Sequence, residues 1–270
     1  MPHRIRTTAH ATIAALALAL TGCGDDNANP ASTASSTSAP GSTTLPPPAG
    51  TTTVPGTGAV PAAELGRAQQ AVMTFLESLG SGDVDAARRV VGPISEQRSG
   101  AAGGLTSMLR QSTEGHGAWP AATDREVTTI GFAPGLAVVV LEGTLRVEGT
   151  TEHRVAAFPV RKAESADTWF VEPWAYDLAT APPLTIVSPT VDAEERATVR
   201  GGQSFQLTVS VSARASGTVY VSYDGAPPAL QRVSTADPVV FAPRSAPELV
   251  TVLYSDGPTL AATAFNVATS

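Results

Sequence analysis

Four patterns of hydrophobic and polar residues follow one another along the chain of 270 residues. A short apolar run near the start gives way to a polar stretch. Apolar residues at helical spacing come next, and then short segments in which apolar and polar residues alternate. Spacings of three and four indicate helices, whereas alternation indicates strands. The pattern therefore predicts a targeting segment, an unfolded linker, a group of helices and a series of β-strands, in that order.

The helical pattern begins at residue 61 with the stretch PAAELGRAQQAVMTFLESLGSG. Its apolar residues fall on one helical face; they are Leu65, Ala68, Val72, Phe75, Leu76 and Leu79. Gly80 and Gly82 end this helix, and Asp83 is suited to cap a second, short helix over DVDAARRVVG. Apolar residues between positions 105 and 109 predict a third short helix.

From residue 124 the period changes to that of strands. Four segments have strand-like composition: REVTTIGFA, LAVVVLEGTLRVEG, EHRVAAFPVRKA and TWFVEPWAYD. In the second of them Leu141, Leu145 and Val147 alternate with polar residues. The order of the elements predicts helices followed by an antiparallel meander.

The segment AVMTFLESLGSGDVDAARRVVGP, followed by four strands, resembles the opening of nuclear-transport-factor-2-like domains. The resemblance implies that residues 61–180 form an α+β cone-like domain, in which helices pack on a strongly curved antiparallel sheet. That family includes enzymes, ligand binders and accessory domains, so the fold by itself implies no single activity.

The region after Pro182 and Pro183 contains strand-like segments and turns without a helical pattern. In SFQLTVSVSA and GTVYVSYDG the apolar residues fall on one face of each segment. About six or seven such strands over residues 184–270 predict an all-β sandwich, which resembles a bacterial immunoglobulin-like domain. The region has neither Cys nor Trp, and this excludes the antibody type of that fold.

The N-terminal apolar run has the pattern of a secretory signal. Arg4 and Arg6 precede about ten apolar residues, too few to cross a hydrocarbon core about 30 Å thick as a helix. The run ends in LTGC, residues 20–23, which resembles the lipobox of bacterial lipoproteins. The resemblance implies that residues 1–22 are a signal peptide cleaved between Gly22 and Cys23. It also implies that a lipid on Cys23 anchors the protein to the extracytoplasmic face of the cell membrane.

Residues 23–60 are almost entirely Gly, Ser, Thr, Ala, Pro, Asp and Asn. Such a segment buries too little apolar surface to offset its ordering entropy, so we expect a disordered tether. Loss of Arg4 and Arg6 with the signal leaves 15 basic and 24 acidic residues, a net charge of −9. An acidic chain argues against nucleic-acid binding. The expected partners are the membrane, through the lipid, and an envelope protein, a cell-wall polymer or a small ligand.

The sequence has no spacing of His, Cys, Asp or Glu typical of a metal site, no G-x-S-x-G turn and no phosphate-binding loop, so we expect no metal and no cofactor. The best candidate for chemistry is TWFVEPWAYD, where Trp169 and Trp174 flank Glu172. An acid among aromatic residues at the mouth of the cone would have a raised pKa. His116 and Trp119 are expected to line the same mouth. In the alternative interpretation, the aromatic residues fill the core and Glu172 faces solvent.

Three functions are consistent with these patterns. We expect first a non-catalytic envelope lipoprotein that binds a partner or scaffolds a complex. The alternative is a small-ligand-binding protein that uses the cavity of the α+β domain. The third is a hydrolase or isomerase in that cavity, with Glu172 or His116 as the base.

Overall fold

The computed structural model describes residues 60–147, 149–164, 166–176, 178, 183–212, 216–233 and 237–270. The chain divides into the units Met1–Pro47 and Pro48–Ser270, and the described residues all belong to the second unit. The predicted signal peptide, the lipidation site at Cys23 and the tether up to residue 59 lie outside the described residues. Within the described ranges, no helix is long and apolar enough to cross a membrane.

The helices come first in the described chain, as predicted. They are α1 (Ala62–Ser81), α2 (Val84–Val90), α3 (Pro93–Ser99) and α4 (Leu105–His116), with short 3₁₀ turns η1 (Gly100–Ala102) and η2 (Trp119–Ala121). Gly82 ends α1 with a left-handed φ of 71°, and the Asp83 carboxylate accepts the Ala86 amide at 2.9 Å. The predicted helix end and cap are therefore confirmed, whereas α3 was not predicted.

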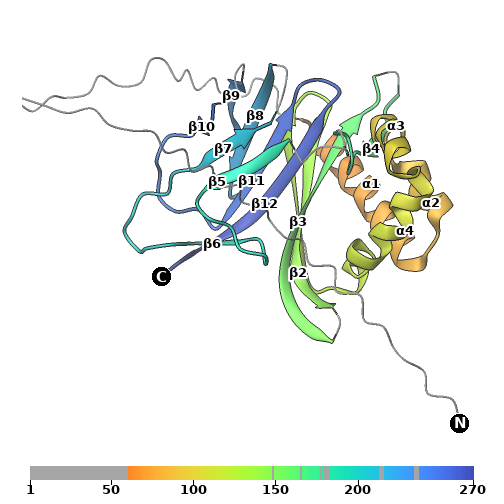
Figure 1. Cartoon of the computed structure of the whole chain (residues 1–270), viewed down its shortest axis with the longest axis horizontal. Coiled ribbons are helices and arrows are strands. Elements are labelled where there is room, and N and C mark those ends of the chain that lie inside the picture. Colours follow the sequence, from red (N-terminus) through yellow and green to blue (C-terminus); the bar gives the residue numbers. More distant parts are fainter. Residues whose placement is uncertain are drawn as a thin grey trace, which may run out of the picture. The chain divides into compact units, whose positions relative to one another are not determined.

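The order of the predicted four-stranded meander is also confirmed, although only Trp169–Val171 of the predicted last segment, TWFVEPWAYD, form a strand. Its strands are β1 (Thr123–Ala133), β2 (Leu136–Val147), β3 (Thr150–Lys162) and β4 (Trp169–Val171), antiparallel in the order β1-β2-β3-β4. We call this the first sheet. The helices cover one of its faces (Figure 1), and the core between them includes Phe75, Leu76, Val139, Phe158 and Val160.

Two further sheets contain the C-terminal strands. The strands are β5 (Leu184–Ser188), β6 (Arg196–Val199), β7 (Thr208–Val211), β8 (Gly217–Tyr223), β9 (Ala229–Val233), β10 (Val239–Val240), β11 (Leu249–Ser255) and β12 (Leu260–Thr269). The order is β6-β12-β11-β8-β9 in the central sheet and β10-β7-β5 in the outer sheet. Phe205, Leu207, Val209 and Val211 are buried in the core between these two sheets, as their shared face predicted.

A third apolar cluster joins the first sheet to the central sheet; we call it the junction core. Its buried members are Ile130, Phe132, Val138, Val140, Val155, Ala175, Leu253, Leu260 and Ala264. The Leu260 amide also donates to the Ala175 carbonyl at 2.7 Å, and the Asn266 amide side chain donates to Glu142 at 2.8 Å. The second face of the first sheet is therefore buried too, and four layers follow one another: helices, first sheet, central sheet and outer sheet.

The junction core predicts that the helices and the sandwich unfold together. Leu253 belongs to the central sheet and is fully buried, so Leu253→Ala should lower the free energy of unfolding by about 2–5 kcal/mol. All three tryptophans, Trp119, Trp169 and Trp174, lie on the helical side. We call the helices with the first sheet one half of the described chain, and the central and outer sheets the other half. If the two halves unfold together, the urea midpoint of tryptophan fluorescence should fall in Leu253→Ala, although Leu253 and the tryptophans lie in different halves.

The matched control for that experiment is Val187→Ala, since Val187 is 51% exposed. A change of less than about 0.5 kcal/mol is expected for it. An unaltered tryptophan transition in Leu253→Ala would mean that the two halves unfold independently.

Candidate functional site

The five residues predicted to line one cavity are mostly parts of the helical core. Trp119 of η2, Trp169 of β4 and Trp174 are 2%, 4% and 8% exposed. The Trp174 ring packs edge-on against Phe75, with a centroid distance of 6.5 Å. The indole rings therefore fill the space between helices and sheet, as the alternative interpretation of the sequence expected for aromatic residues.

Glu172 does not face solvent, in contrast to the other half of that interpretation. Its side chain is completely buried, and its Oε2 accepts the backbone amide of Ser95 at 2.8 Å. The Trp174 amide donates to the Ser95 hydroxyl at 3.1 Å, which ties the residues after β4 to the same helix. Because Ser95 lies in the first turn of α3, the Glu172 carboxylate satisfies an amide that the helix itself leaves unpaired.

Gly92 makes this contact possible. A Cβ atom at this position would lie 2.0 Å from Glu172 Oε1, far inside van der Waals contact. The Gly92 amide donates to the Val171 carbonyl at 2.8 Å, so the start of α3 runs beside the end of β4. Helix α3 is thus held by an acid that stands about eighty residues later in the chain, and Glu172 is a structural residue.

The electrostatics of Glu172 follow from this position. Burial raises its pKa, and the Ser95 hydroxyl and amide and the charge of Arg161 act in the opposite direction. Its Oε1 has no hydrogen-bond partner among the described residues. The direction of the pKa shift agrees with the sequence-based expectation, but the carboxyl group is turned toward α3.

His116 and Trp174 border a groove of about 480 Å³ that we call the junction groove. Its walls are residues 155–159 of β3 and 261–264 of β12, together with Pro173, Tyr176, Leu184 and Glu195. The His116 ring packs edge-on against Phe158 at 5.3 Å, and burial lowers its pKa. Of the five predicted residues, the structure brings only these two to one groove.

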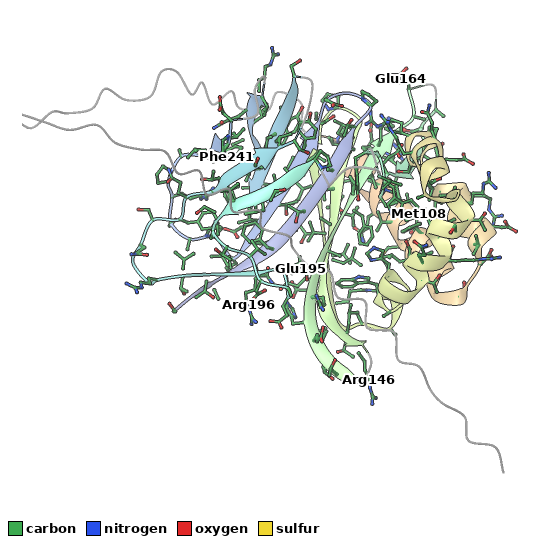
Figure 2. All side chains as sticks on the ribbon, viewed as in Figure 1. Met108, Arg146, Glu164, Glu195, Arg196 and Phe241 are labelled. Atoms are coloured by element: carbon green, nitrogen blue, oxygen red, sulfur yellow. The ribbon has the colours of Figure 1, made fainter. Side chains whose placement is uncertain are left out.

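A second cleft, of about 800 Å³, lies near the start of α1 and between the β1–β2, β3–β4 and β11–β12 turns. Its ion pairs join Lys162 to Glu64 and to Asp167, each at 3.0 Å, and Arg67 to Asp167 at 2.9 Å. Glu164, labelled in Figure 2, belongs to the same lining. Sequence reasoning missed this network, because its members come from segments that only the fold brings together.

The described residues contain no group of three or more His, Cys, Asp or Glu side chains placed to hold a metal ion. Comparison of the chain with protein-family models found no match, and neither did a search of curated proteins.

The contact between Gly92 and Glu172 predicts a strong effect of a small substitution. Gly92→Ala should destabilise the protein by about 1–3 kcal/mol or more, because the added methyl group displaces the buried carboxylate. Gly66→Ala is the matched control: Gly66 lies within α1 with no atom near its Cβ position. That variant should gain about 0.5–1 kcal/mol. Equal effects of the two substitutions in thermal unfolding would contradict the role given to Gly92.

The raised pKa of Glu172 predicts a pH dependence. The folded protein holds this proton more tightly than the unfolded chain, so it loses stability as pH rises from the ordinary value of 4.5 to the raised pKa. Glu172→Gln keeps an oxygen for the Ser95 amide and has no charge to bury. Its free energy of unfolding relative to the unchanged protein should therefore increase with pH over this interval. Urea titrations at several pH values measure the difference, and a difference independent of pH would contradict the assignment.

Proposed function

We propose that this chain is a non-catalytic binding protein of the bacterial cell envelope, anchored to the membrane by a lipid on Cys23. The sequence LTGC at residues 20–23, after a basic start and a short apolar run, supports the anchor. In this proposal residues 23–59 are the tether that carries the folded part away from the membrane. Val60, which the sequence pattern assigned to the tether, is 7% exposed and packs in the helical core instead.

The proposal includes the finer identity of the two folded regions. The helices α1 to α4 on one face of an antiparallel meander support a nuclear-transport-factor-2-like region over residues 61–180. The two sheets around a common core support an immunoglobulin-like region over residues 184–270. Neither architecture specifies a reaction.

One observation carries the non-catalytic part of the proposal. Glu172, the strongest candidate for a catalytic acid or base in the sequence, is fully buried and accepts the Ser95 amide at the start of α3. A general acid or base must reach the proton that it transfers. A carboxylate committed to a helix terminus inside the core does not meet this requirement.

A second observation favours binding of a ligand. The junction groove combines the His116 ring with Phe158, Trp174 and Tyr176. Its volume of about 480 Å³ is in the range of pockets that hold small ligands. If the protein binds a small ligand, we therefore expect it in the junction groove, between the first and central sheets, and not inside the helical core.

The anchor is tested with a clickable fatty acid fed to bacteria that produce the protein. The label should appear on the unchanged protein and on Ser35→Ala, a control within the tether. It should be absent from Cys23→Ala, which should also leave the detergent phase after Triton X-114 partition. Labelling or detergent partition of Cys23→Ala equal to that of the control would refute the lipid anchor.

A further inference from the structure

The junction groove runs along the edge of a strand. Five consecutive residues of β3, 155–159, line it. Successive side chains of a strand point to opposite faces, so a groove on one face would meet only every second residue. Contact with all five places the groove against the edge of β3 that does not pair with β2.

The backbone groups that β3 presents at this edge can be identified. The Pro159 carbonyl accepts the Glu172 amide at 2.8 Å, so residue 159 points away from β2. Burial raises the pKa of Glu195, and the Val155 N–H, which faces that carboxylate, opposes the rise. Outward groups recur at every second residue of an antiparallel strand, so the N–H and C=O of Ala157 also point outward. Among the described residues no other element hydrogen-bonds to them.

Strand β12, the facing wall, also has outward backbone groups without a described partner. The backbone N–H of Leu260 donates to the Ala175 carbonyl at 2.7 Å, and the backbone N–H of Asn266 donates to the Glu195 carbonyl at 2.9 Å. Between these two bonds the backbone groups of Ala262 and Ala264 point outward by the same alternation. Strand β6 pairs with β12 only from Asn266 onward. On the side of β12 that faces away from β11, no described backbone group hydrogen-bonds to Ala262 or Ala264.

The side chains of the groove are mainly apolar and aromatic. Phe158, Trp174 and Tyr176 supply rings, and residues 261–264 of β12, three alanines and Thr263, supply only small side chains. No hydrogen bond joins the His116 ring to another described side chain or backbone group. Glu195, labelled in Figure 2, closes one end of the groove beside Arg154, with 3.6 Å between the charged atoms.

Unpaired donors and acceptors along a strand edge are complementary to an extended peptide. The edge from Val155 to Pro159 spans about 13 Å at the usual rise of a strand, room for about three residues. The accessible part of the edge stops at Pro159, which has no N–H and whose carbonyl accepts the Glu172 amide. At the other end it stops at Val155, whose N–H faces Glu195. The aromatic residues beside this edge suit one apolar or aromatic side chain.

We propose that the junction groove binds a short extended peptide of about three residues with an aromatic central side chain, which pairs with the β3 edge at Ala157. This inference rests on the ligand-binding role proposed for the junction groove and deepens it by naming the ligand class; it does not depend on the lipid anchor. The site consists of residues from both halves of the described chain, so the junction core holds it together.

The test uses the full-length protein in detergent micelles and blocked tripeptides as probes. Acetyl-Ala-Phe-Ala-amide should bind and shift the ¹⁵N–¹H signals of Ala157, Ala262 and Ala264. The same peptide with its backbone amides N-methylated has lost its donors, and it should bind at least about tenfold more weakly. Acetyl-Ala-Glu-Ala-amide should also bind more weakly, because its carboxylate would enter an aromatic site.

Two substitutions of Ala157 distinguish the contribution of its backbone N–H to binding from that of its side-chain size. Ala157→Pro removes the outward N–H and leaves the ladder to β2 intact, so it should weaken binding about tenfold. Ala157→Ser keeps the N–H and should bind within about threefold of the unchanged protein. Tryptophan fluorescence on urea unfolding establishes that each variant is folded. If Ala157→Pro does not fold, the N-methylated peptide still tests the same hydrogen bonds.

Three results would overturn the proposal: no shift of the three amides at millimolar peptide, equal binding of the N-methylated peptide, or unchanged binding by folded Ala157→Pro. None of them bears on the lipid anchor, which the fatty-acid label tests separately. Conversely, failure of the unchanged protein to take up the fatty-acid label would refute the lipid anchor and leave the peptide-binding proposal standing.

Discussion

The apolar character of both faces of the first sheet is the constraint on which the rest of the structure depends. One face packs on the helices, and the other meets the central sheet through the junction core. Full burial of a Val, Leu, Ile or Phe side chain contributes about 1.5–3 kcal/mol. Exposure of Ile130, Phe132, Val138 and Val140 would thus cost a sum comparable to the stability of a whole domain. Each half therefore stabilises the other by covering its apolar residues in the junction core and excluding water from them.

This packing also determines the position of the groove proposed to bind a peptide. Burial of the sheet faces leaves the strand edges as the places where backbone groups remain accessible. The β3 edge and the β12 edge come together beside Trp174 and His116, at one border of the junction core. The groove is thus a consequence of how the two halves join. Its outward amides, for which the described residues supply no backbone partner, have a defined position in each strand. Glu172, in contrast, is used entirely to hold α3.

Local patterns predicted the elements whose signals are local. The periodicity from Leu65 to Leu79 predicted α1, and Asp83 predicted the cap of α2. Helix α3 was missed because Gly92-Pro93 resembles a helix end, and its stabilising acid is distant in sequence. The uninterrupted apolar run from Leu136 to Leu141 was the one signal that β2 is buried on both faces. The position of Glu172 could not be predicted, because an acid between two tryptophans suits a pocket wall and a buried cap equally.

Native-state hydrogen exchange tests the interdependence of the two halves most directly, because it resolves the opening free energy of each element. The amides of Val139 and Leu141 report the first sheet, and those of Val252 and Phe265 report the core between the central and outer sheets. If the halves stabilise each other through the junction core, the slowest amides of both groups exchange with one common free energy and one common dependence on urea. Two distinct free energies, with one half opening while the other stays closed, would contradict the account.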